Sequence, residues 1–247
     1  MDTKTKSYYF FNIYGLADLI ERAVRNGADF EFFDEKLVIN AYVKFSRCTL
    51  LHIYIKSIAM AYYSKDFRKN GDLVAEDEIE EWNNLCKIYK IQKLSKFKLN
   101  DEDFDAGNWF CKNEKKFFEL FSNMAEEVFF ILFNNRDFLL KFNKIVSEID
   151  IKIPNKFLTK KGTIKRINIP QWVKRAVYYR DRGRCVFCNK DLTGLVNHFN
   201  NSNYDHIVPL DLLGANDPCN IQLACESCNK KKSNRISKTT NSYIPWW

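Results

Sequence analysis

Turn-forming residues are scarce in this chain, which contains only eight glycines and five prolines among its 247 residues. Hydrophobic residues make up 46% of the sequence and aromatic residues 15%, a composition that argues against a disordered protein. We therefore expect a compact protein rich in helices. Its length suffices for one large or two modest domains, each with a core of its own, and we favour two.

Long apolar runs are missing as well. The longest one, residues 49–63, is interrupted by His52 and Lys56 and is shorter than the roughly 20 apolar residues that cross a bilayer. The first residues contain no apolar core followed by a small-residue cleavage site, as a secretory signal would. We expect a cytoplasmic protein with no membrane partner. In a reducing compartment, its eight cysteines are better explained as thiols or metal ligands than as disulfides.

Positive charge is concentrated toward the C-terminus. The formal net charge of the whole chain is +8, whereas residues 152–240 hold seventeen Lys and Arg against six Asp and Glu, a net charge of +11. A basic surface of this kind binds phosphate backbones with an affinity that falls as salt rises. A merely solvated surface would explain the charge equally well, so charge alone does not establish nucleic-acid binding.

The hydrophobic pattern is helical in the first 150 residues. Apolar residues recur three and four positions apart, and Asn-Gly pairs at 26–27 and 70–71 are expected to end the first helix and a long second one. This pattern indicates a bundle of four to six helices. A basic amphipathic helix is expected over 171–181, between Pro170 and Gly183.

Changes in composition divide the chain. We expect a linker with a short pair of strands where prolines, a glycine and basic residues replace the helical pattern. The expected organisation is a helical domain at 1–150, this linker at 151–169, a second domain at 170–240 and an aromatic tail at 241–247.

Two cysteine pairs, Cys185 with Cys188 and Cys225 with Cys228, have the spacing of metal-binding knuckles and are 36 residues apart. Each pair can place both sulfurs on one ion, and four thiolates complete a closed tetrahedral zinc site. A redox pair or chance would explain one such pair, but two in a small basic segment favour zinc. Because a four-cysteine site has no open position for water, this zinc is expected to stabilise the domain without taking part in catalysis.

A second motif lies between the knuckles and just beyond them, in NYDHIVPLDLLGANDPCNIQLACESCNKKKSNR. Thirteen residues separate His206 from Asn220, and eight separate Asn220 from Asn229. With these spacings the segment resembles the HNH endonuclease family. The matching residues are Asp205, His206, Ile207, Pro209, Asn220, Asn229 and Lys232. The resemblance covers residues 171–235 and leaves the first 150 unexplained.

The resemblance implies an α+β chain, in which a zinc-stabilised ββα domain with one catalytic metal follows the helical domain. A hairpin would carry Asp205 and His206, a loop Asn220, and a helix beginning near Cys225 would carry Asn229. Asp205 and Asn229 would hold Mg²⁺ or Mn²⁺, His206 would act as general base, and Asn220 would order the loop. The ordinary histidine pKa of ~6.5 suits a base near neutral pH, and oxygen ligands suit these cations.

Alternative roles remain open for several of these residues. Asp205 could be a turn residue, and Asn220 or Asn229 a helix cap. Residues on one strand alternate between faces, so Asp205 and His206 serve one site only if the strand is distorted or ends there. The polar stretch 198–203 is longer than a tight hairpin needs, and we interpret it as a substrate-side loop.

Basic residues on both sides of the motif are candidate phosphate contacts. They would position DNA without reading bases, although any one of them could belong to a solvated helix face. The candidates are Lys174, Arg175, Arg182, Arg184, Lys230, Lys231, Lys232 and Arg235.

The leading functional hypothesis is a metal-dependent endonuclease that hydrolyses DNA; the alternative that its substrate is RNA stays open. The helical domain would serve targeting, homodimerisation or control by a protein partner, in phage defence or a mobile element. The alternative is a non-catalytic zinc protein that only binds nucleic acid, which has no need of the Asp205, His206, Asn220 and Asn229 set. A third hypothesis is RNA cleavage by the helical domain, because residues 47–52 resemble the Arg-to-His motif of HEPN ribonucleases.

Overall fold

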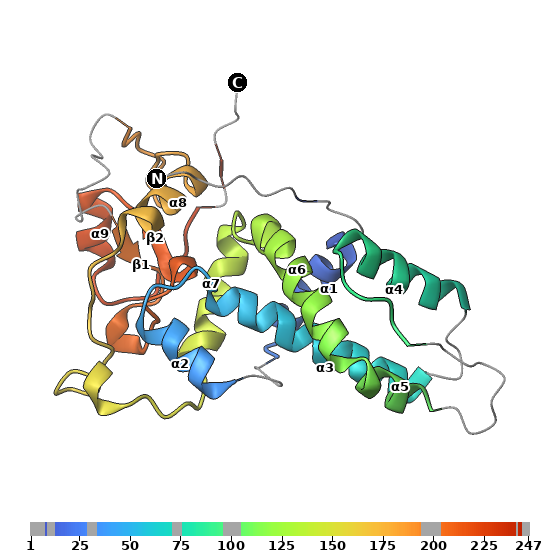
Figure 1. The fold of residues 1–247 in the computed structure, drawn as a ribbon. Helices are drawn as coiled ribbons and strands as arrows, with labels where there is room; N and C mark the ends of the chain where they lie inside the picture. The colour runs from blue at the N-terminus through green and yellow to red at the C-terminus, as the bar shows by residue number, and fades with distance from the viewer. Residues whose placement is uncertain are drawn as a thin grey trace.

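A bundle of helices is followed by a small α+β segment in the computed structural model (Figure 1). The structure describes residues 8, 13–28, 34–70, 76–95, 105–193, 204–240 and 242–243. The predicted α+β class is confirmed. None of the described helices combines the length and the apolar character that a bilayer crossing demands.

The described part of the N-terminal region contains seven helices, more than the four to six expected. They are α1 (Ile13–Arg25), α2 (Glu35–Val43), α3 (Leu50–Asn70), α4 (Glu76–Ile88), α5 (Ala106–Lys112), α6 (Glu114–Leu132) and α7 (Arg136–Ser147). The long second helix predicted from periodicity is wrong, because α2 and α3 are separate. The Asp217 carboxylate accepts a hydrogen bond of 2.9 Å from the Leu50 backbone N–H and so stabilises the start of α3.

Helix α3 lies at the centre of the bundle. It packs along α6 and also contacts α1, α2 and α5 (Figure 1). Leu50, Leu51, Tyr54 and Ile55 on it are fully buried, so more than one face of this helix is covered. By contrast, α1 buries a single stripe spaced three and four residues apart, as an amphipathic helix does.

His52 belongs to this core. Its ring is 6% exposed and stacks on Phe129 with 4.2 Å between centroids, and its Nδ1 lies 2.8 Å from the Thr49 hydroxyl. Arg47 lies before α3, on the surface. A buried histidine and an exposed arginine outside the helix do not form a ribonuclease site, which argues against the HEPN hypothesis.

The C-terminal segment contains a two-stranded sheet between two helices. Its elements are η2 (Asn155–Phe157), α8 (Gln171–Arg180), β1 (Tyr204–His206), η4 (Leu210–Leu212), η5 (Pro218–Asn220), β2 (Ile221–Leu223) and α9 (Glu226–Lys232). The strands are antiparallel, with Tyr204 opposite Leu223 and His206 opposite Ile221. Helix α8 confirms the helix expected after Pro170. The strand pair expected at 151–169 is a single bridge between Leu158 and Ile164.

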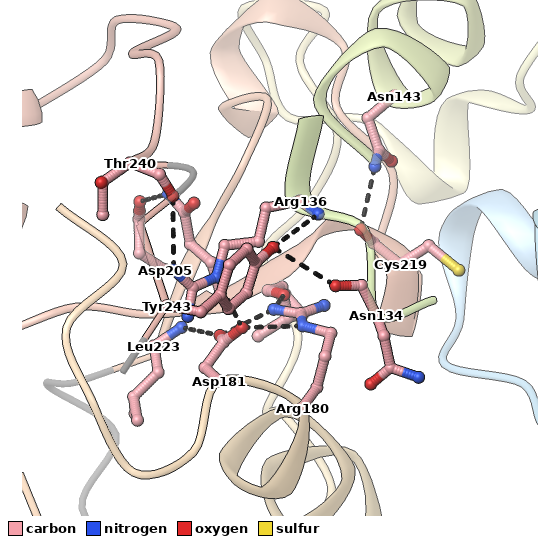
Figure 2. Close-up of polar contacts among 12 residues, drawn as sticks. Asn134, Arg136, Asn143, Arg180, Asp181, Asp205, Cys219, Leu223, Thr240 and Tyr243 are labelled. Carbon is pink, nitrogen blue, oxygen red and sulfur yellow. Dashed lines mark hydrogen bonds and ion pairs between the residues drawn. The ribbon is translucent and has the colours of Figure 1, made fainter. Parts of the chain in front are cut away.

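One hydrophobic core extends from the bundle into the C-terminal segment. Ile207, Leu210, Ala215 and Cys219 pack with the buried side chains of α1 to α7, while a second cluster fills the space under α8 and the sheet. On the polar side, Asn143 of α7 donates a hydrogen bond of 2.9 Å to the Cys219 carbonyl (Figure 2). The boundaries expected at residues 150 and 169 remain predictions about independent folding, and the two parts share this core.

A buried ion-pair cluster joins α7, α8 and β2. Asp181, at the end of α8, is fully buried and accepts hydrogen bonds of 2.8 and 2.9 Å from Arg180 and one of 2.9 Å from the Leu223 backbone N–H (Figure 2). Arg136 of α7 pairs with the same carboxylate at 3.5 Å. Tyr243 of the aromatic tail lies against Arg136, with 4.5 Å between the guanidinium carbon and the ring centroid.

Candidate functional site

The four knuckle cysteines form one cluster, in which all four sulfur atoms lie within 4.8 Å of one another. The Sγ atoms of Cys188 and Cys225 are 3.8 Å apart. Tetrahedral zinc with Zn–S bonds of ~2.3 Å requires sulfurs ~3.8 Å apart, so the cluster fits a zinc ion. The cysteines can hold a structural metal, as the spacing predicted.

The cluster lies where several elements meet. The first knuckle follows α8, and its Val186 backbone N–H donates to the Leu223 carbonyl of β2 at 2.9 Å. Cys225 precedes the first residue of α9, and Cys228 lies in its first turn. A metal held by both knuckles therefore fixes α9 to the sheet and to the end of α8.

His206 is the last residue of β1 and is almost fully buried, with 2% of its surface exposed. Burial is the main cause that lowers the pKa of its imidazole to about 4, and the charge of Arg166 acts in the same direction. The ring is therefore neutral at pH 7. Its Nε2 lies 3.4 Å from the Asn216 side-chain oxygen, and its Nδ1 is a buried nitrogen without a hydrogen-bond partner. A neutral imidazole with one unengaged nitrogen can accept a proton.

Asp205 presents its carboxylate to α9. Its Oδ2 accepts hydrogen bonds of 2.9 Å from both Lys232 and Gln222. The Lys232 ammonium also donates to the His206 carbonyl at 2.8 Å, which brings the main chain of β1 against α9. Asn229 precedes Lys232 by three positions on this helix and therefore lies on the same helix face.

The groups around Asp205 determine whether a catalytic cation fits beside its carboxylate. The Lys232 ammonium already places one positive charge there. The Gln222 side-chain oxygen nearby is buried and has no hydrogen-bond partner. Carboxylate and amide oxygens are the donors that Mg²⁺ and Mn²⁺ prefer, so Asp205 and Asn229 are suitable ligand types, while the Lys232 ammonium holds the Asp205 carboxylate in this structure.

Asn220 closes the loop between β1 and β2. Its side-chain nitrogen donates to the carbonyls of Val208 and Ala215 at 3.0 and 2.9 Å, and its oxygen accepts from the Val208 backbone N–H at 2.8 Å. The Ile207 backbone N–H donates to the Asn220 carbonyl at 2.7 Å. One buried amide thus satisfies three backbone groups just beyond His206, and these contacts support the loop-ordering role expected of it.

Gly214 in this loop allows a close approach that a larger residue would prevent. A Cβ atom there would lie 1.9 Å from the Val208 carbonyl oxygen and 2.9 Å from the Asn220 side-chain nitrogen. We expect Gly214→Ala to lower the free energy of unfolding by about 1–3 kcal/mol, because backbone must shift to accept the methyl group. Thermal denaturation would measure this as a decrease of several degrees in Tm.

Gly27→Ala is the matched control for that substitution. Gly27 has a φ of 70° but open space around it, so an alanine there pays only the left-handed backbone cost of about 1–2 kcal/mol. A Gly214→Ala protein with unchanged Tm would show that the loop is not held against Val208.

The candidate phosphate-binding residues differ in whether their side chains are buried or already paired with an acidic residue. Lys174 is buried over the Tyr204 ring at 5.9 Å, and burial lowers its pKa. Lys232 is bound to Asp205, as described above. Arg184 pairs with Asp191 at 3.2 Å, and Lys230 pairs with Glu226 at 2.6 Å.

The other four candidates take no part in the ion pairs described above. Arg175, Lys231 and Arg235 are exposed, and Arg182 lies 5.5 Å from the Tyr243 ring centroid. Lys231, Lys232 and Arg235 line a cavity of about 480 Å³ together with Phe187 and two of the knuckle cysteines, Cys188 and Cys228. The polar stretch 198–203 lies outside the described residues.

Comparison with known proteins agrees with this geometry. Residues 185–235 match the family model described as HNH endonuclease. The matched stretch, residues 185–235, is an HNH domain. The match covers both knuckles, β1, β2 and α9, and an HNH nuclease domain implies a nucleic-acid substrate. The chain matches no curated protein and no solved structure.

Several residues that shape the HNH domain were missed by sequence reasoning. Gln222 stands opposite Asp205 in the sheet register, a pairing that an assumed hairpin alignment could have suggested. Asn216 contacts His206 from the loop, and nothing in its sequence context separates it from an ordinary turn residue. Arg166 precedes the matched region altogether and carried no signal.

Proposed function

We propose that this protein is an endonuclease that uses Mg²⁺ or Mn²⁺ to hydrolyse phosphodiester bonds in DNA. The observation that carries the proposal is that Asp205 and His206, whose Nδ1 has no hydrogen-bond partner, stand side by side at the end of β1 in the stretch that matches the HNH endonuclease model. This pair lies in a zinc-fitted HNH domain. A base and a cation site are the two requirements of phosphodiester hydrolysis near neutral pH.

His206 performs the proton transfer in the proposed reaction. Its unengaged Nδ1 takes a proton from water, the resulting hydroxide attacks phosphorus, and the bond to the leaving sugar oxygen breaks as that oxygen takes a proton from a solvent water; His206 then returns its own proton to solvent. Asp205 and Asn229 would hold the divalent cation, which supplies positive charge to the phosphate oxygens when bound. Asn220 holds the 207–220 loop and thereby the backbone that follows His206.

A second candidate function is nucleic-acid binding without cleavage. Lys232 satisfies the Asp205 carboxylate without any metal, at 2.9 Å, as a purely binding protein would require. In that case His206 would serve only to fill space beside Asn216.

We also propose a role for the helical region in targeting, homodimerisation or control of cleavage, in phage defence or a mobile element. Exposed aromatic side chains on α1 and α6, namely Tyr14, Phe118 and Phe130, support contact with a partner. Cytoplasmic location remains part of this proposal.

A cleavage assay tests the leading proposal. Supercoiled plasmid, linear DNA, single-stranded DNA and RNA would be incubated with the protein in Mg²⁺, in Mn²⁺ and in chelator. We expect metal-dependent nicking of DNA and a loss of about 10²–10⁴-fold in rate for His206→Ala, the usual contribution of a general base.

Lys161→Ala is the control, since Lys161 is an exposed turn residue with no part in the proposed chemistry. Circular dichroism would verify that His206→Ala remains folded. Equal cleavage by His206→Ala and the parent protein would remove the residue from its role. Nucleic-acid binding without cleavage by the parent under every metal condition would favour the second function.

A further inference from the structure

The segment before the HNH domain is firmly attached to the rest of the chain. Leu158 and Ile164 form a β-bridge, and the Lys165 backbone N–H donates to the Phe157 carbonyl at 2.9 Å. Ile164 is 2% exposed and packs into the core shared with the bundle. Residues 157–165 therefore form a fixed turn, although composition indicated a linker.

Asn216 connects this turn to the general base. Its side-chain nitrogen donates to the Lys165 carbonyl at 2.9 Å, and its side-chain oxygen lies 3.4 Å from the His206 Nε2. Asn216 is itself fully buried, and its backbone N–H donates to the Tyr42 carbonyl at 2.8 Å. The Asn216 side chain thus connects the backbone at residue 165 to the His206 imidazole through these two contacts.

The next residue along this backbone is Arg166, whose side chain is exposed. Its side chain leaves the main chain one residue after the Lys165 carbonyl that Asn216 binds, and the Lys232 ammonium reaches the His206 carbonyl from α9. The two cations differ in what binds them. Lys232 is 2% exposed and is paired with Asp205, whereas Arg166 forms no ion pair with an acidic residue in the parts of the chain that the structure describes.

We propose that Arg166 binds the phosphate group on which His206 acts. A guanidinium on a fixed backbone beside the base can donate two parallel hydrogen bonds to two oxygens of one phosphate. This inference rests on the proposed function and extends it, because it places a substrate-binding residue outside the matched region 185–235. The ligand is a phosphodiester, and the segment at 151–169 contributes to the active site.

The test compares Arg166→Ala, Arg166→Lys and the control Lys161→Ala, which removes a charge from the turn of the same segment. Binding to a fluorescent DNA duplex would be measured by anisotropy at several salt concentrations with Mg²⁺. Every protein in this arm carries His206→Ala, so that no substrate is cleaved. Cleavage kinetics would be measured in parallel with His206 intact, and Tm would verify folding.

We expect Arg166→Ala to weaken duplex binding about tenfold or more, as for loss of a charge-assisted hydrogen bond. The slope of log affinity against log salt should decrease in magnitude by about 0.9, the value for one phosphate contact. Arg166→Lys should recover the salt slope but only part of the affinity, since an ammonium cannot make the paired contact. Lys161→Ala should behave as the parent does.

The outcomes separate this proposal from the one on which it rests. If the parent protein cleaves DNA but Arg166→Ala binds and cleaves as Lys161→Ala does, Arg166 is not a phosphate ligand and the nuclease proposal stands. If the parent cleaves nothing while Arg166→Ala still loses duplex affinity, the binding site stands and catalysis fails. Equal loss in Arg166→Ala and Lys161→Ala would mean only general attraction to the basic surface and would overturn the inference.

Discussion

Cys225→Ser is expected to remove zinc from the protein and to unfold the HNH domain. The parent should retain one zinc ion per chain after dialysis, and the variant close to none, as measured by atomic emission. Structural zinc sites have apparent binding free energies of about 10–16 kcal/mol in small zinc peptides, comparable with the whole stability of a typical domain, about 5–15 kcal/mol. A lost ligand therefore removes a large share of what keeps α9 on the sheet.

Cys111→Ser is the matched control, because Cys111 is an exposed cysteine on α5 away from the cluster. Its zinc content and melting curve should match those of the parent. A Cys225→Ser protein that contains no zinc yet melts as the parent does would contradict a structural role for the metal.

Asp181→Ala is expected to give the second large effect. It removes a fully buried carboxylate and leaves the guanidiniums of Arg136 and Arg180, 5% and 6% exposed, without their shared anion (Figure 2). Breaking a buried ion pair from one side costs about 3–5 kcal/mol, since the remaining charge is neither solvated nor paired. For a chain of this size we expect Tm to fall by about 10 °C.

Asp191→Ala is the control, because it removes an exposed ion pair and so separates the cost of breaking a buried pair from that of losing an ion pair in general. Asp191 pairs with Arg184 at 3.2 Å, but its side chain is 52% exposed, so water replaces the lost contact and Tm should change little. Equal melting temperatures for the two variants would show that Asp181 does not connect α7, α8 and β2.

The sequence predicted those features that depend on residues close together in the chain. Each CxxC pair is recognised from four adjacent residues, and the four sulfurs do cluster as predicted. The spacing of His206, Asn220 and Asn229 identified the HNH domain in the same way, since a family motif is a fixed string. Their roles in catalysis remain predictions.

Contacts between distant segments left no such signal. The start of α3 is bound by the neighbouring Thr49 hydroxyl and also by Asp217, which is 167 positions from Leu50. Asp181 looked like one more charge in a basic stretch, yet the fold places it between Arg136 and Arg180 with no access to solvent. Periodicity reports which face of a helix is apolar, but not which remote carboxylate will cap it or be buried beneath it.

The core that the helices share with Ile207, Leu210 and Cys219 has a practical consequence for protein engineering. An HNH domain that is cut at residue 170 and grafted onto another scaffold would expose the apolar side chains that had packed against the helical bundle. Transferring this domain to another protein therefore means transferring the helices that cover it as well.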